Sequence, residues 1–491
     1  MSILPRRAPS RKGIPTMADI APPNAPPLPA GEGLTQGLAD YILGVRYEAL
    51  PAEVRSKCLE LLLDALACGL AGSRTPLGQT VRELARAMGG CPQASLWGTE
   101  AKSSCTWAAY HNASVINALD YDDTAEIGHP GATVIPVIWA LAEWKDLDGG
   151  ALIEAMVTGY ETSIRTAAAV LPSVARYSQI HGIGTPQTLG AAAAAARLLG
   201  LNREQTLNAL GIAGANAPVA HAGKFGWTDK SISYIKDNVA VPAEIGLRAA
   251  VLAEQGYQGS ESILDGETGF WVMAGSDRFD YPQLMDFSEY RILNVSLKPY
   301  PCCRWIHTTL DVCRDLRRQG PFEARDIHRV DVFSLPVLAK QFQRKVPHNF
   351  IDLQFSVPLS LSLAICNVPW AQWWRKENHL RQEVLDTAAR IEVHSQDDYQ
   401  VRFEDLGRRS ACIPTRLEIT LKNGRKLEGY AEEARGLPSK PLSPAERLEK
   451  FNHLTEGLLA PDPRDRLRKD IQNLDRLSRI PRISELMAPT L

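Results

Sequence analysis

Hydrophobic residues at helical spacing dominate the first half of the chain, and this pattern restricts the fold more than any other feature. After Pro51, apolar residues recur every three or four positions from Val54 to Leu66, and glycines at 69 and 72 mark the end of that segment. Similar segments cover residues 81–88, 108–119, 134–144, 152–170, 188–199 and 239–252. Short loops join them, so the sequence predicts a large helical domain with a buried core.

From about residue 291 the pattern changes to a mixture of strands and helices. Residues 328–333, 389–394 and 416–421 alternate as strands do, and Asn423-Gly424 after the last of them is typical of a hairpin turn. Segments 308–316 and 355–363 between the strands have helical character. We therefore expect a mainly α protein, with a large all-helical domain and a smaller α+β domain.

These patterns predict four parts of the chain. Residues 1–33 form a disordered arm, because the stretch PPNAPPLPAGEG cannot build a core. Residues 34–280 form the helical domain and 281–436 the α+β domain. In residues 437–491, Ser443 and Glu446 have the spacing of a capping box, and the helices that follow are expected to pack back on the helical domain.

Composition excludes several classes of protein. A formal net charge of −2 argues against a nucleic-acid partner, and no apolar run reaches the ~18 residues that a membrane span needs. The nine cysteines are an odd number without a C-x-x-C pair, so we expect no metal site and a reducing, cytoplasmic location. The alternative location is mitochondrial, because residues 1–18 contain arginines and no acid.

The stretch NALDYDDTAEIGHPGATVI, residues 117–135, gathers chemically capable side chains between two helical segments. If the preceding helix continues, Asp120 and Thr124 share one face, while Asp122 and Asp123 point elsewhere. Glycines and a proline then hold His129 on a tight turn. Pro130 is suited to start the next helix, whose N-terminus would face an anionic ligand. The alternative is a purely structural capping cluster.

Other candidate residues lie farther along the chain. His181 precedes a helix in a glycine-containing loop, where a capping role is the alternative. Lys236 precedes an apolar helix and needs an anion to pair with, either its neighbour Asp237 or a ligand; a solvated lysine is the alternative.

The last cluster is KPYPCCRWIH, residues 298–307. It presents Lys298, Tyr300, Cys303 and Arg304 on a proline-stiffened loop at the predicted domain junction. A solvated basic loop is the alternative. The paired thiols have no second Cys or His group at ligand spacing, which argues against a metal.

Four motifs together resemble the MmgE/PrpD family over residues 35 to 480. They are DYDDT…GHP from Asp120, HGIGTP followed by an alanine run from His181, Lys236 before its Ala- and Gly-containing helix, and KPYPCCR…H from Lys298. The family includes 2-methylcitrate dehydratase, cis-aconitate decarboxylase and iminodisuccinate epimerase. The resemblance implies a helical domain plus a smaller α+β domain, a homodimer, and no cofactor.

The resemblance also implies a pocket between the two domains. Residues matching positions that line it are Asp120, Thr124, His129, His181, Lys236 and Lys298, and Cys303 stands where some decarboxylase members carry a histidine. We expect His181 and His129 to transfer protons, Asp120 to orient one of them, and Lys298 to act with them. Lys236, Thr124, Cys303, Arg304 and Tyr300 are expected to bind substrate.

The predicted function is a cofactor-independent lyase for a citrate-like tricarboxylate. The leading prediction for the reaction is dehydration of 2-methylcitrate or an alkylcitrate to the corresponding aconitate. The alternatives are decarboxylation of cis-aconitate to itaconate, epimerisation of a dicarboxylate such as iminodisuccinate, and a non-catalytic binding protein. Histidine has an ordinary pKa of ~6.5, so it can serve as acid or base at neutral pH.

Overall fold

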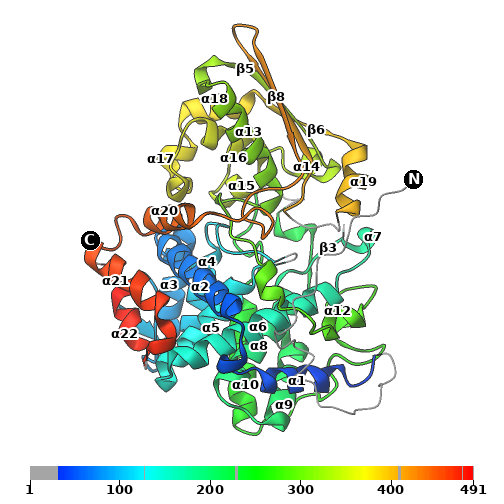
Figure 1. Ribbon diagram of the computed structural model, residues 1–491, viewed down its shortest axis with the longest axis vertical. Coiled ribbons are helices and arrows are strands. Elements are labelled where there is room, and N and C mark those ends of the chain that lie inside the picture. The colour runs from blue at the N-terminus through cyan, green and yellow to red at the C-terminus, as the bar shows by residue number, and fades with distance from the viewer. Residues whose placement is uncertain are drawn as a thin grey trace.

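The computed structural model describes residues 31–125, 128–177, 179–226, 231–406, 411–477 and 479–489 (Figure 1). All but the last three residues of the predicted arm, 1–33, lie outside the described residues. Figure 1 shows a helical body below, a mixed α and β part above, and helix α20 between them. The predicted fold class, mainly α with a smaller α+β domain, is confirmed.

The helical body is built around long, deeply buried helices. The apolar spacing after Pro51 forms α2, and the alanine run 191–196 is fully buried in α8. Small residues let these helices approach closely: a Cβ on Gly190 of α8 would lie 2.7 Å from the carbonyl oxygen of Gly159 in α6. The helices are α1 (Leu34–Gly44), α2 (Ala52–Gly72), α3 (Pro76–Met88), α4 (Cys105–Asn117), α5 (Pro130–Lys145), α6 (Gly149–Ala169), α7 (Val174–Tyr177), α8 (Gly184–Leu198), α9 (Arg203–Asn216), α10 (Ala240–Glu254), α11 (Phe270–Met273) and α12 (Tyr281–Met285).

The α+β part has a four-stranded sheet in the order β6-β5-β7-β8. The strands are β5 (Ile327–Ser334), β6 (Ile391–Ser395), β7 (Thr415–Leu421) and β8 (Lys426–Ala431); β5 and β6 are parallel and the other pairs antiparallel. The predicted Asn423-Gly424 turn joins β7 to β8, with Gly424 at a φ of 86°. Its helices are α13 (His307–Gln319), α14 (Pro336–Gln341), α15 (Ile351–Gln354), α16 (Val357–Ile365), α17 (Lys376–His379), α18 (Gln382–Ala389) and α19 (Asp397–Asp405).

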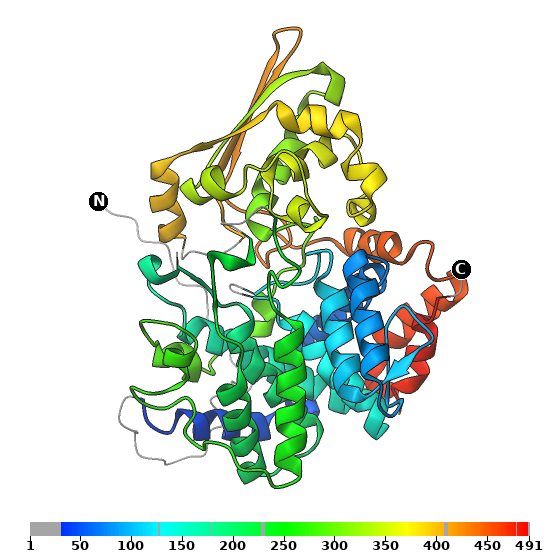
Figure 2. The same ribbon diagram turned by 180° about the vertical axis from the view of Figure 1, so that it is seen from behind.

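The last helices return to the helical body, as the view from behind also shows (Figure 2). They are α20 (Pro444–Thr455), α21 (Pro461–Gln472) and α22 (Pro481–Ser484). Ser443 and Glu446 form the predicted capping box, and Lys450 of α20 pairs with Asp64 of α2 at 2.7 Å. Phe451 and Leu467 join the same hydrophobic core as α2.

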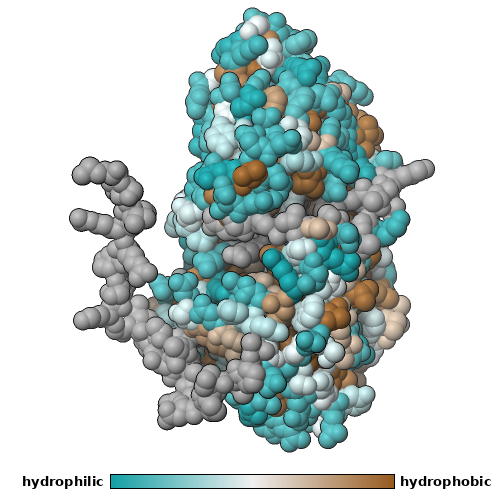
Figure 3. Space-filling model, turned by 90° about the vertical axis from the view of Figure 1, so that its right-hand side faces the viewer, coloured by the Kyte–Doolittle hydropathy of each residue, from teal (hydrophilic) through white to brown (hydrophobic). Residues whose placement is uncertain are grey.

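Two short two-stranded sheets complete the fold, β1 (Ala94–Ser95) with β2 (Lys102–Ser103) and β3 (Ile180–His181) with β4 (His221–Ala222). One side of the molecule is mainly hydrophilic on the α+β part and carries hydrophobic patches on the helical body (Figure 3). The homodimer stays a prediction. Among the described residues, no helix combines the length and the apolar content of a membrane span.

Candidate active site

The loop between α4 and α5 carries the centre of the site. Helix α4 ends at Asn117, and Asp120 has a left-handed backbone with φ 51°. The chain then runs extended, and Thr124 forms an antiparallel bridge with Ser296, two residues before Lys298. The prediction that Asp120 and Thr124 share a helix face is therefore wrong, because the helix stops before either residue.

Asp120 lies between two lysines that are distant in sequence. The Nζ of Lys298 donates to its Oδ1 at 2.8 Å and to its carbonyl oxygen at 2.9 Å. The Nζ of Lys236 donates to the same Oδ1 at 3.2 Å and to Oδ2 of Asp237 at 2.5 Å. All three side chains of the Asp120–lysine group are at most 2% exposed. An ammonium group has three protons, so each lysine keeps one beyond these contacts among the described residues.

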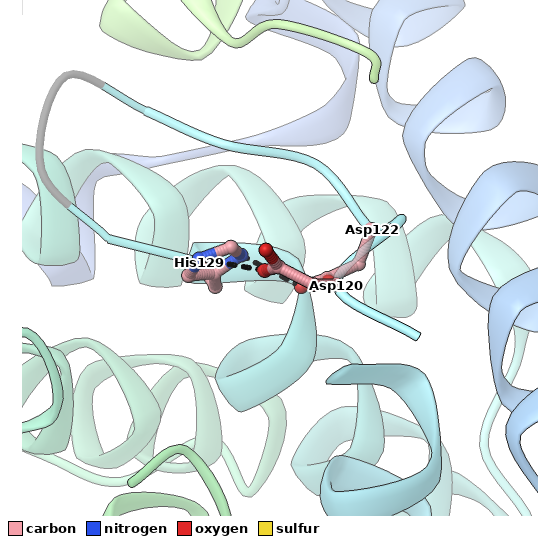
Figure 4. A group of neighbouring side chains, drawn as sticks. All are labelled: Asp120, Asp122 and His129. Atoms are coloured by element: carbon pink, nitrogen blue, oxygen red, sulfur yellow. Dashed lines mark hydrogen bonds and ion pairs between the residues drawn. The ribbon is translucent and has the colours of Figure 1, made fainter. Parts of the chain in front are cut away.

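His129 faces the same carboxylate from the start of α5 (Figure 4). Its Nδ1 lies 3.0 Å from Oδ2 of Asp122 and 3.1 Å from the carbonyl oxygen of Asp123. Both neighbours can only accept, so Nδ1 carries the proton. The Nε2 atom is 3.8 Å from Oδ1 of Asp120 and 3.6 Å from Oδ2 of Asp237. The prediction that Asp122 points elsewhere is wrong.

The charges around His129 decide its protonation state. Burial by itself lowers the pKa of an imidazole, but the carboxylates of Asp122 and Asp237 outweigh it and raise the pKa of His129 above its ordinary value. The same pairing lowers the pKa of Asp122 despite its burial. Burial is likewise outweighed at Lys236, where Asp120 and Asp237 raise the pKa. The carboxylates of the cluster therefore favour the charged forms of His129 and Lys236.

Asp123 has a different task from Asp122. Its carboxylate accepts the amide of Gly131 at 3.1 Å and the hydroxyl of Tyr160 at 2.5 Å. The chain's own carboxylate thus occupies the N-terminus of α5, which was expected to face a ligand, so that expectation is wrong. Burial raises the pKa of Asp123 to about 7, although the Tyr160 hydrogen bond acts in the opposite direction.

Two buried oxygens of the loop have no hydrogen-bond partner among the described residues. They are Oδ2 of Asp120 and Oγ1 of Thr124. Buried polar atoms in proteins are nearly always satisfied, so these two mark where a polar ligand would fit. Cys303 lies near the Asp120 carboxylate and is only partly exposed; burial raises the pKa of its thiol to about 12, which keeps the thiol protonated.

Asp120, Asp122 and His129 bring their ligand atoms within 4.8 Å of one another, a spacing that could suit a metal ion. However, two lysine ammonium groups already contact the Oδ1 of Asp120. A divalent cation at that oxygen would lie beside both positive charges and be repelled. The chemistry of the group therefore fits an ion-pair network better than a metal centre.

Comparison with known proteins identifies the family of this chain. The sequence model of the MmgE/PrpD N-terminal domain matches residues 36–281, and that of the MmgE/PrpD C-terminal domain matches residues 300–476. The chain belongs to the MmgE/PrpD family. The family prediction is thereby confirmed, as is the expectation of an enzyme of the lyase class.

Relatives that match this chain include cis-aconitate decarboxylases and 2-methylcitrate dehydratases. The cis-aconitate decarboxylase of Homo sapiens is 25% identical over 91% of this chain and 92% of its own length. The cis-aconitate decarboxylase of Aspergillus terreus (strain NIH 2624 / FGSC A1156) is 23% identical over 93% and 96%. A 2-methylcitrate dehydratase of Cupriavidus necator is 26% identical over 57% of this chain and 59% of its own.

The structure separates the predicted site residues of this family member into two groups. Asp120, His129, Lys236 and Lys298 meet, with Cys303 near the Asp120 carboxylate, and Thr124 lies on the same loop as Asp120. Tyr300 turns away: its hydroxyl donates to Asp311 at 2.8 Å. Arg304 also turns away and donates to the carbonyl oxygen of Arg435 at 2.7 Å. Burial lowers the pKa of Arg304 to about 10.

His181 is placed only by its backbone, because its side chain lies outside the described part of the structure. It belongs to β3 and pairs with His221 of β4. A Cβ on Gly184, just beyond it, would lie 2.4 Å from the carbonyl oxygen of Asn238, so this segment adjoins the loop of Lys236. Asp122 and Asp123 were not predicted as site residues, and Asp237 was predicted only as a possible partner of Lys236, although all three lie close to predicted site residues in the sequence.

Proposed function

We propose that the protein decarboxylates an unsaturated tricarboxylate of the cis-aconitate type. The observation that carries this proposal is the buried ring of His129, which Asp122 holds at Nδ1 and whose Nε2 faces the carboxylates of Asp120 and Asp237, beside two lysines. Decarboxylation leaves a carbanion that must be protonated, and an imidazolium with a raised pKa is suited to that step. The near full-length match to two cis-aconitate decarboxylases supports the same choice.

The substrate is a trianion, so binding requires cations. Lys236 and Lys298 each retain a proton for a substrate carboxylate, and both are fixed in place by Asp120. Thr124 offers a buried hydroxyl on the same loop as Asp120. Because the lysines are already paired when the site is empty, they stay charged in a buried environment and need no rearrangement to meet the substrate.

The reaction follows from the substrate's own bonds. The bond from the methylene carbon to its carboxylate breaks, carbon dioxide leaves, and the released electron pair forms a terminal double bond. The original double-bond pair moves to the carbon next to another carboxylate, where Nε2 of His129 supplies the proton. Asp122 holds the opposite ring nitrogen and stabilises the charged ring. His181 remains a proposed second proton donor.

Dehydration of a 2-methylcitrate-type acid is the second candidate. It is favoured by the unpaired Oδ2 of Asp120, a carboxylate oxygen that could remove the proton next to a substrate carboxylate. The same imidazolium of His129 would then protonate the departing hydroxyl. The match to a 2-methylcitrate dehydratase supports this reaction, over a shorter part of the chain.

One experiment distinguishes these reactions. Purified protein is incubated with cis-aconitate, 2-methylcitrate, an alkylcitrate and iminodisuccinate in deuterated water, and products are analysed by mass spectrometry together with released carbon dioxide. We expect carbon dioxide and one deuterium in itaconate. Loss of water without gas would select dehydration, and deuterium uptake without net product would select epimerisation. No turnover with any acid, in a correctly folded protein, would overturn the enzymatic proposal and favour a binding role.

A further inference from the structure

A cavity of about 430 Å³ adjoins the loop that carries Asp120. Tyr121 and Pro299 form part of its wall, and they are the sequence neighbours of Asp120 and Lys298. None of Asp120, His129, Lys236 and Lys298 lines it. The remaining wall comes from α13, from Trp370 after α16, and from α20. The volume is that of a small-molecule site.

The wall of the cavity has an aromatic side. The rings of Tyr300 and Trp370 lie 5.0 Å apart, and the guanidinium of Arg435 lies 5.6 Å from the Tyr300 ring. Trp370 is only half-buried, so part of its ring is available to a ligand. Aromatic faces of this kind stack on flat apolar groups.

The other side of the cavity is basic. Five Arg and Lys side chains line it against two Glu side chains. Arg435 and Lys450 are paired with Asp311 and Asp64, so their charge is already compensated.

Two guanidinium groups of α13 are less tightly paired. Arg317 donates to the side chain of Asn367 at 2.8 Å and to the carbonyl oxygen of Phe322 at 3.2 Å, and its ion pair with Glu323 is long, at 3.5 Å. Arg318 is exposed and makes no ion pair or hydrogen bond among the described residues. Guanidinium groups of this kind bind carboxylate or phosphate groups in a two-pronged manner.

The cavity is connected to the active site through Tyr121. The Tyr121 hydroxyl donates to the carbonyl oxygen of Pro299 at 3.1 Å, and Lys450 donates to the Tyr121 carbonyl at 2.7 Å. The Lys450 ammonium also lies 4.1 Å from the centre of the Tyr121 ring. A molecule in the cavity would therefore contact Tyr121, the residue between Asp120 and Asp122.

We propose that this cavity binds a second ligand, an anion with a flat apolar body, and that its occupancy steadies the loop that carries Asp120. The apolar body lies along Trp370 and Tyr300, and the anionic group binds Arg317 and Arg318. The site is distinct from the substrate site, since none of Asp120, His129, Lys236 and Lys298 lines it.

The test uses anilinonaphthalene sulfonate, a fluorescent flat anion, with the full-length protein. We expect saturable binding of one molecule per chain, weakened about tenfold in the Arg317→Ala, Arg318→Ala double variant. Arg325→Ala is the matched control, because Arg325 is also exposed, belongs to the same α+β part, and lies outside the cavity. Trp370→Leu should weaken binding as well. Equal affinity in the wild type and all variants would overturn the proposal.

Two further measurements complete the test. Displacement by naphthoate or by naphthyl phosphate identifies a carboxylate or a phosphate as the preferred group; failure of both would overturn an anion site. Hydrogen–deuterium exchange of the peptide covering residues 118–125 should slow when the probe binds the wild type, and should not change in the double variant. Unchanged exchange in the wild type would overturn the link to the catalytic loop. Neither measurement depends on which reaction the enzyme performs.

Discussion

The loop around Asp120 adjoins two regions, a buried charge cluster and an open cavity, and the cations of these two regions are paired to different degrees. On one side, Lys236 and Lys298 are almost completely buried and share the Asp120 carboxylate. On the other, Arg317 is half-buried and has only a long ion pair with Glu323, at 3.5 Å, and Arg318 is exposed and has no partner among the described residues. Buried cations must be paired to exist, whereas exposed ones are stable without a partner. The buried side is therefore suited to fixed catalytic geometry, and the open side to a ligand that comes and goes.

Removing one buried charge should have the largest effect. Lys298→Met leaves Asp120 with one cation fewer, so we expect a loss of about 3–5 kcal/mol in the free energy of unfolding and at least about 10²-fold in kcat. Urea unfolding and steady-state kinetics measure the two losses.

The Asp120→Asn, Lys298→Met double variant is the control for this prediction. It removes both charges of the pair, so stability should largely return while activity stays lost. A double variant as unstable as Lys298→Met would contradict the view that pairing, rather than packing, holds the buried side together.

Removing the imidazole of His129 should have the next largest effect on activity. His129→Gln should lose about 10²-fold or more in kcat, as expected for a general acid. In the wild type the protonated ring is the active form, so the rate should fall as pH rises through the pKa of His129, which lies above ~6.5. The measurement is the pH dependence of kcat.

Asp122→Asn tests the cause of that pKa. The carboxylate of Asp122 raises the pKa of His129, so its removal should move the alkaline fall in rate to lower pH. The variant keeps the size of the side chain, and folding is checked by circular dichroism. An unmoved profile would show that another group governs the rate.

Asp123 offers a third test on the buried side, through the pH dependence of stability. A carboxyl whose folded pKa is raised contributes stability at low pH and loses that contribution as pH rises to about 7. Asp123→Asn should remove this loss, so the variant should lack a fall in unfolding free energy, on the order of 4 kcal/mol, that the wild type shows between pH ~4 and ~7. Urea unfolding at several pH values measures it. Identical pH dependence in both proteins would show that Asp123 does not titrate there.

A substitution at the cavity should give the smallest effect. Arg318→Ala should change the free energy of unfolding by no more than about 0.5 kcal/mol, because the side chain is exposed and unpaired among the described residues. Its activity without any added anion should match that of Arg325→Ala within about twofold. A large loss in Arg318→Ala alone would mean that the cavity belongs to the catalytic machinery, and the contrast between the two sides would fail.

The sequence alone predicted local structure well. The helical spacing after Pro51, the capping box at Ser443 and the Asn423-Gly424 turn all depend on neighbours within a few residues, and all appear as expected. The family motifs likewise identified Lys236 and Lys298, although nothing local fixes where these side chains point.

The errors have a common physical cause. Asp122 and Asp123 were predicted to point away because a helix was assumed to continue past Asn117. The chain instead turns at Asp120, under contacts with lysines that lie 116 and 178 positions away. Tyr300 and Arg304 stand close to Lys298 in sequence, yet they turn toward Asp311 and Arg435. Long-range contacts of this kind leave no pattern in the local sequence.

The left-handed backbone at Asp120 has a consequence for how this enzyme can evolve. A φ of 51° is adopted readily by glycine, asparagine and aspartate, and of these only aspartate can neutralise two ammonium groups. We therefore expect position 120 to tolerate almost no substitution. We expect new substrate preferences to arise instead at neighbouring positions with fewer constraints. Cys303 is such a position, because its side chain is partly exposed.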